Sequence, residues 1–222
     1  MRGTAKRNAD RALLMDVYGA MFDAIGPRHW WPGRTRFEVV VGAILTQNTA
    51  WRNVDRAIRN LRRARVLNPK AMRDMEEEKL AELIVPAGYF RVKARRLMNF
   101  LRFLDSGYGC SLDRLFRLDA EALRGELLGV NGIGPETADS IVLYAAGKPV
   151  FVIDAYTRRI LARHGWCAPD AGYDELQALF AGSLPADAPL FNEYHALLVY
   201  VGNNFCRPRK PLCGECPLEI FK

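Results

Sequence analysis

Apolar residues recur at helical spacing along almost the whole chain, and this periodicity constrains the fold more than any other feature. Alternating patterns typical of half-buried strands are nearly absent. The best strand candidate, KPVFVID at 148–154, is one short apolar run that cannot form a sheet alone and could equally lead into a buried helix. We therefore expect an all-α fold, with helices at 36–47, 51–67, 78–88, 91–107 and 174–184.

The length and the charge narrow the classes of protein. The 222 residues suffice for one large domain or two small ones, and AAGKP before Val150 marks a candidate boundary near residue 148. The formal net charge of +7 suits a polyanion such as nucleic acid, or an anionic membrane surface. No uncharged apolar run reaches the ~18 residues that a membrane span needs. The basic start lacks an apolar signal-peptide core, and three of five cysteines lie in the last 17 residues, so we expect a cytoplasmic protein whose cysteine cluster serves a metal.

The stretch LLGVNGIGPETADSIVLYAA predicts a helix, a tight turn and a second helix. Gly132 and Gly134 flank Ile133, and glycine permits positive φ or close approach of the backbone to a ligand. Pro135 fits the first position of the second helix. The N–H groups of the turn and of the helix start would then form a phosphate site, although a plain helix corner explains the glycines as well.

Several motifs occur in order along the chain: AILTQNT (43–49), AGYFRVKA (87–94), LxGVxGIGPETAD (127–139), VIDAYTRR (152–159) and the terminal cysteines. Together they resemble the helix-hairpin-helix DNA glycosylases of the endonuclease III superfamily over nearly the whole chain. The resemblance implies a two-domain all-α fold, with the hairpin bundle at 31–148 and a second domain formed by 1–30 and 149–222. It also implies a nucleoid-associated monomer that binds double-stranded DNA containing a damaged base in the cleft between the domains.

The resemblance places the catalytic carboxylate at Asp154, where it would stabilise the oxocarbenium-like charge on the sugar. Asp154 is also a favourable N-cap for the helix that follows. Family members that cut the strand carry a lysine eighteen residues earlier, where this chain has Glu136. A carboxylate cannot form an imine, so the resemblance implies a monofunctional glycosylase that uses water. The alternatives are a glycosylase–lyase on oxidised pyrimidines that uses an unmatched lysine such as Lys93 or Lys148, and a non-catalytic DNA-binding module.

Other residues match the DNA contacts of the family. Gln47, with Asn48 beside it, stands where the family fills the gap left by a flipped base. Tyr89 stands where the family has a wedge, although a core aromatic is the alternative. Phosphate and backbone contacts are expected from the hairpin and from the cysteine loop: Gly132, Ile133, Gly134, Thr137, Arg207, Arg209 and Lys210.

The stretch RHWWPGRTRFE contains adjacent tryptophans that cannot both point into one core. Aromatic faces attract cationic bases such as 3-methyladenine. With the missing lysine, this stretch resembles the 3-methyladenine glycosylase branch, which implies a base pocket lined by Trp30, Trp31, Pro32 and Trp51. An aromatic plug over the bundle, and a uracil or thymine mismatch glycosylase, remain alternatives.

Cys206, Cys213 and Cys216 follow the spacing of the family's [4Fe–4S] loop, but the fourth position holds Lys222. The resemblance favours a cluster, with iron bound by three cysteines and another ligand. Loss of the cluster, a chain end that is not natural, and zinc are alternatives. We expect His195, Cys110 and Cys167 to be packed core residues.

Overall fold

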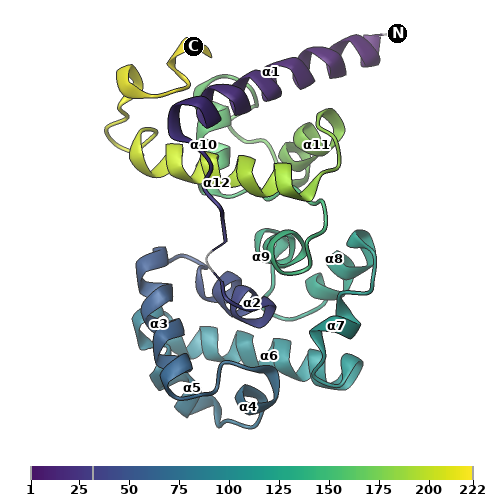
Figure 1. Cartoon of the computed structure of the whole chain (residues 1–222), viewed down its shortest axis with the longest axis vertical. Helices are drawn as coiled ribbons and strands as arrows, with labels where there is room; N and C mark the ends of the chain where they lie inside the picture. Colours follow the sequence, from purple (N-terminus) through teal and green to yellow (C-terminus); the bar gives the residue numbers. More distant parts are fainter. Residues whose placement is uncertain (1, 32, 222) are drawn as a thin grey trace. The chain divides into compact units, whose positions relative to one another are not determined.

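A computed structural model describes the backbone of residues 2–31 and 33–221, and the side chains from residue 10 onward within these ranges. Every regular element in these ranges is helical, which confirms the predicted all-α fold (Figure 1). None of the described helices is both long enough and apolar enough to cross a membrane. The chain divides into two compact units. We call residues 31–148 the hairpin unit, and residues 1–30 with 149–222 the terminal unit.

Helix α2 (Arg36–Leu45) forms the centre of the hairpin unit. Its residues 37–45 are all buried, because the sequence RFEVVVGAIL leaves no polar face for water. The one acid among them, Glu38, pairs with Arg62 at 2.8 Å. The N-cap Thr35 accepts a hydrogen bond from the N–H of Glu38. Helix α2 packs on α3 (Trp51–Arg63), α6 (Phe90–Tyr108), α9 (Pro135–Ser140) and η2 (Ile141–Ala145).

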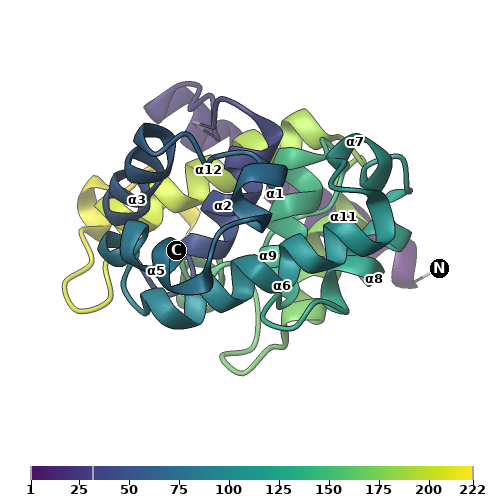
Figure 2. The ribbon, with the colours of Figure 1, turned by 90° about the horizontal axis from the view of Figure 1, so that it is seen from below.

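The other elements of the hairpin unit surround α2. Helix α3 is amphipathic and buries Val54, Ala57, Ile58 and Leu61 at helical spacing. Figure 2 shows α5 beside α6, which it contacts. Helix α9 continues into a π-helical turn, η2. The bounds are α3 (Trp51–Arg63), α4 (Pro69–Arg73), α5 (Glu77–Leu83), η1 (Val85–Ala87), α6 (Phe90–Tyr108), α7 (Leu112–Leu115), α8 (Ala120–Leu128), α9 (Pro135–Ser140) and η2 (Ile141–Ala145).

The terminal unit contains α1 (Arg2–Ile25), α10 (Ala155–Arg163), α11 (Tyr173–Ser183), α12 (Ala188–Asn204), η3 (Cys213–Glu215) and η4 (Glu219–Phe221). Helix α12 packs on α1 and on α10 (Figure 1). At Gly202, a Cβ atom would lie 2.5 Å from the Tyr156 ring. Glycine at this position therefore lets α10 and α12 approach closely.

The strand candidate at 148–154 is not a strand but an extended segment without regular structure, and its Phe151, Val152 and Ile153 are buried. Phe151 stacks on Phe180 with ring centroids 3.8 Å apart. Side chains of α11 replace the missing sheet partner. Gln177 donates to the Phe151 carbonyl at 2.8 Å, and the hydroxyl of Tyr173 accepts from the Ile153 N–H at 3.4 Å. The apolar run thus anchors the residue that follows it, Asp154.

Candidate nucleic-acid interface and acidic centre

The hairpin turn joins α8 to α9 and depends on a glycine. Gly132 has φ +97°, and a Cβ atom there would lie 2.3 Å from Cγ of Arg96 on α6. The turn therefore sits on the Arg96 side chain at a distance that only glycine allows. Ile133 is buried, while Gly134 and Glu136 are exposed.

Gln47 lies in the short segment after α2 and binds the hairpin. Its amide nitrogen donates to the Gly132 carbonyl at 3.1 Å and to the Thr137 hydroxyl at 2.9 Å. Its amide oxygen accepts a hydrogen bond from the Arg96 guanidinium. Thr137 is buried, so in this arrangement its hydroxyl serves the hairpin rather than the surface. Sequence reasoning missed Arg96, because nothing local distinguishes it from the other arginines of α6.

Lys93 fixes the two segments that lead to Gln47 and Tyr89, two of the predicted DNA contacts of the hairpin unit. Its side chain is buried, and its ammonium group donates to the carbonyls of Leu45 at 2.9 Å and Ala87 at 2.8 Å. Burial, together with the nearby Arg96 charge, lowers the pKa of Lys93 to about 8. The amine is therefore enclosed and hydrogen-bonded to two backbone carbonyls, which makes it unsuited to attack a sugar.

Tyr89 and Asn48 both have left-handed backbone conformations, with φ of 44° and 52°. The left-handed conformation is energetically costly for a bulky residue such as tyrosine, whereas asparagine tolerates it better. The Tyr89 side chain is 73% exposed, which rules out a core aromatic. The strained backbone at the start of α6 thus projects the ring into solvent.

Trp31 and Trp51 come together in the hairpin unit with their ring centroids 5.1 Å apart and nearly perpendicular. Tyr144 completes this aromatic cluster, its centroid 5.0 Å from that of Trp31. All three rings are half-buried. Sequence reasoning missed Tyr144, because the π-helical turn that carries it shifts the helical register. Trp30 belongs to the terminal unit, and Pro32 lies outside the described residues.

Asp154 is the N-cap of α10, and its Oδ1 accepts a hydrogen bond from the Thr157 N–H at 2.7 Å. Its side chain is 12% exposed, and Oδ2 lies 3.6 Å from Nε2 of His195 on α12. At that distance, which is beyond normal hydrogen-bond length, His195 acts on the carboxylate chiefly by electrostatic attraction. Burial alone would raise the pKa of Asp154, but His195 and Thr157 outweigh it and hold this pKa below its ordinary value. The carboxylate is therefore ionised at neutral pH.

His195 was expected to be a packed core residue, and it is buried. Sequence reasoning missed its proximity to Asp154, because the two residues are 41 positions apart and no local pattern connects them.

The terminal loop follows α12 and is attached to α10 by two arginines. Arg159 donates to the carbonyls of Cys206 and Gly202, and Arg163 donates to those of Arg207 and Pro208. The predicted phosphate contacts of this loop are all exposed: Arg207, Arg209 and Lys210.

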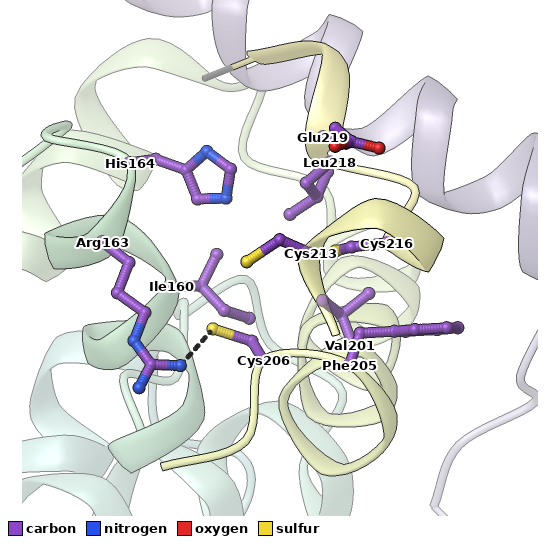
Figure 3. Close-up of a pocket in the computed structure, with 10 residues that line it drawn as sticks. All are labelled: Ile160, Arg163, His164, Val201, Phe205, Cys206, Cys213, Cys216, Leu218 and Glu219. Carbon is purple, nitrogen blue, oxygen red and sulfur yellow. Dashed lines mark hydrogen bonds between the residues drawn. The ribbon is translucent and has the colours of Figure 1, made fainter. Parts of the chain in front are cut away.

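The thiols of Cys206, Cys213 and Cys216 line one pocket, together with His164 and other residues of the terminal unit (Figure 3). Among the described residues, no three His, Cys, Asp or Glu side chains stand close enough to hold one metal ion. A zinc ion needs all of its ligands on one atom at ~2.0–2.3 Å. A [4Fe–4S] cluster spreads its ligands over four irons, so thiols around a pocket fit it better. Lys222 lies outside the described residues.

Known proteins resemble this chain in sequence and in fold. The family described as HhH-GPD superfamily base excision DNA repair protein matches residues 41–186. A Methanocaldococcus jannaschii protein, named provisionally as a DNA repair glycosylase, is 46% identical over 94% of this chain and 95% of its own. Endonuclease III of Thermotoga maritima is 30% identical over 82% of this chain and 80% of its own.

Two solved structures have the same fold. The H. pylori 3-methyladenine DNA glycosylase MagIII, bound to 1,N6-ethenoadenine, superimposes with a TM-score of 0.72 at 28% identity, covering 87% of this chain and 97% of the other. An endonuclease III–DNA complex gives a TM-score of 0.82 at 22% identity, covering 95% and 94%.

We predict that Gly132→Ala lowers the free energy of unfolding by about 1–3 kcal/mol, because the added Cβ meets Arg96 and the positive φ becomes strained. The matched control is Gly134→Ala, where φ is −94° and nothing lies within 4 Å. It should cost less than about 1 kcal/mol, since Gly134 is only an N-cap without a side-chain bond. Urea unfolding measures both. Equal losses would contradict the contact with Arg96.

A second prediction concerns pH. Between the folded pKa of Lys93, about 8, and its ordinary value of 10.5, the unfolded chain binds more protons than the folded one. The stability contributed by this group therefore rises with pH across that window. From pH ~7.5 to ~9.5, the wild type should gain about 2 kcal/mol of unfolding free energy relative to Lys93→Met. Lys70→Met, at an exposed position, should follow the wild type. Parallel profiles for wild type and Lys93→Met would refute the assignment.

Proposed function

This chain belongs to the HhH-GPD superfamily of base excision DNA repair proteins and is a DNA glycosylase, and we propose that it hydrolyses the N-glycosidic bond of a flipped alkylated purine such as 3-methyladenine. The proposal rests mainly on the state of the Asp154 side chain. Its carboxylate is ionised, anchored by Thr157 and partly exposed. The alkylpurine specificity is supported by the aromatic cluster and by the likeness to MagIII.

In the proposed reaction the bond between C1′ and the base nitrogen breaks, and its electron pair leaves with the base. The Asp154 carboxylate stabilises the positive charge that develops on the sugar. Water then adds to C1′ and releases a proton, which leaves an abasic site. Because its pKa lies below the ordinary value, Asp154 is a weak proton acceptor and acts mainly through its charge.

In the proposed reaction the enzyme leaves the DNA strand intact. Glu136 is exposed at the start of α9, at the position where lyases of this superfamily carry the amine. Lys93, one of the two other lysines named from sequence, is buried and bound to two carbonyls. The chain thus offers no Schiff-base amine at either position.

The DNA contacts are also proposals. Tyr89 has the exposure that a wedge requires, and Arg207, Arg209 and Lys210 are accessible to phosphates. Gln47 and Asn48 would act beside the hairpin, with Gly132, Ile133, Gly134 and Thr137 shaping the turn. Trp31 and Trp51, joined by Tyr144, would stack on a cationic base. The sequence resemblance also implies Trp30 and Pro32 as residues of the base pocket.

We also infer that the terminal loop holds a [4Fe–4S] cluster through Cys206, Cys213 and Cys216. The donor set supports this, because the three thiols line one pocket. Such a cluster would fix the loop that carries the exposed basic residues. We assign it no step in the removal of the base.

A panel of duplexes with single lesions tests the substrate. Alkylated purines should be released, and the product should break only after alkaline treatment. The cationic lesions should be preferred over neutral ones. If only uracil or thymine is released from mismatched DNA, the alkylpurine assignment is wrong, while the assignment as a glycosylase still holds. Strand cleavage without alkali would contradict the monofunctional assignment.

We predict that Asp154→Asn lowers the rate of base release by about 100-fold or more, because it removes the charge that stabilises the transition state. Asparagine is also a good N-cap, so stability and DNA affinity should change little. Asp119→Asn is the matched control, since Asp119 caps α8 in the same way by accepting from the Ala122 N–H at 2.8 Å. Single-turnover base release measures the effect. Undiminished release by the Asp154 variant would show that a different group stabilises the charge on the sugar.

A further prediction concerns the lyase reaction. Glu136→Lys introduces an amine at the lyase position, so borohydride should trap a covalent adduct between this variant and damaged DNA. The wild type and Glu136→Gln should give none. A strong adduct with the wild-type protein would show that another lysine performs the attack.

A further inference from the structure

His164 closes the pocket that the three cysteines line. It is the C-cap of α10 and follows Arg163, whose guanidinium lies 3.3 Å from Sγ of Cys206. Figure 3 shows the imidazole ring directed into the pocket, on the side of the Cys213 thiol. Four side chains that can bind iron, three thiols and one imidazole, therefore face one space.

Two contacts hold the imidazole in this orientation. The ring stacks on Trp166 with centroids 4.5 Å apart and an interplanar angle of 26°. Its Nδ1 lies 3.5 Å from the carbonyl oxygen of Phe221. A histidine that binds a metal commonly directs its other ring nitrogen to a carbonyl, because that partner selects the tautomer. With the proton on Nδ1, the lone pair is on Nε2.

We propose that Nε2 of His164 is the fourth ligand of a [4Fe–4S] cluster held by Cys206, Cys213 and Cys216. It takes the place of the cysteine that the spacing pattern would put at Lys222. The inference depends on the cluster proposed above, and it is independent of which base the enzyme removes.

The other polar groups of the pocket are poorer ligands. The carboxylate of Glu219 is a hard donor that suits magnesium or calcium, and in Figure 3 it points away from the thiols. The guanidinium of Arg163 cannot coordinate iron, but it places a positive charge next to Cys206. Replacement of one thiolate by a neutral imidazole makes the cluster less negative, which raises its reduction potential relative to a four-cysteine cluster.

The experiment uses the full chain purified without oxygen, with iron, sulfide and zinc determined and the cluster followed by EPR. The wild type should contain four irons per chain and absorb at ~400 nm. His164→Ser should lose one iron and give the EPR signal of an oxidised three-iron cluster. Glu219→Gln, which changes the other candidate ligand, should keep all four. His164→Ser combined with Lys222→Cys should regain the fourth iron.

Nitrogen coupling in the wild type gives a second measurement that needs no variant. Pulsed EPR of the reduced cluster should detect one strongly coupled ¹⁴N nucleus. If His164→Ser does not fold, this measurement alone decides whether an imidazole is bound to the cluster. The proposal is overturned by a four-iron cluster in His164→Ser, by the absence of that coupling, or by a protein that contains zinc or no metal. Failure of the lesion panel would refute the proposed substrate and leave these results unchanged.

Discussion

The burial of α2 on every side is the constraint on which the hairpin unit depends. A helix without a polar face has to be surrounded, so α3, α6, α9 and η2 pack around it. The segments at its two ends are then fixed by the same packing. Lys93 completes this arrangement, because its buried ammonium binds the carbonyl at the end of α2 and the one at the end of η1. The fold thereby sets the positions of Gln47 and Tyr89 before any DNA is bound.

In the terminal unit, the carboxylate of Asp154 has a structural task and, in the proposed reaction, a chemical one as well. Asp154 ends a buried extended segment and begins α10, and its two oxygens face different partners. Oδ1 satisfies a backbone N–H of the helix, while Oδ2 faces His195. The hydrogen bond holds the orientation of the group, and the imidazole favours its charged form. The charge needed for stabilising a sugar cation is thus maintained by the same contacts that start the helix.

The sequence predicted local features well. Helical periodicity located α2, α3, α6 and α11, and the glycine turn was found where the residues GIGP occur. The expected N-cap at Asp154 is also present, because capping depends on residues only three positions apart. Each of these features is determined by neighbours within about one or two helical turns.

The sequence did not predict contacts between distant segments. Arg96 binds Gln47 across 49 positions, and no periodicity reveals that pairing. Tyr144 meets Trp31 through a π-helical turn that changes the register after α9. The run at 148–154 looked like a strand because strands and buried extended segments share the same apolar composition. Only the side chains of α11 distinguish the two cases, by supplying the hydrogen bonds that a neighbouring strand would supply.

The threefold attachment of Gln47 has an energetic consequence for a glycosylase that searches long stretches of intact DNA. As long as the side chain holds Gly132, Thr137 and Arg96, it is stored against the protein and cannot enter the base stack. Its release breaks three hydrogen bonds, each with a net value of about 0.5–1.5 kcal/mol and more for the one to the guanidinium. In a well-stacked duplex the released side chain finds few new hydrogen-bond partners. A position vacated by a flipped base provides them. If Gln47 fills the gap left by a flipped base, as proposed, undamaged sites would therefore be passed with its side chain still bound to the hairpin.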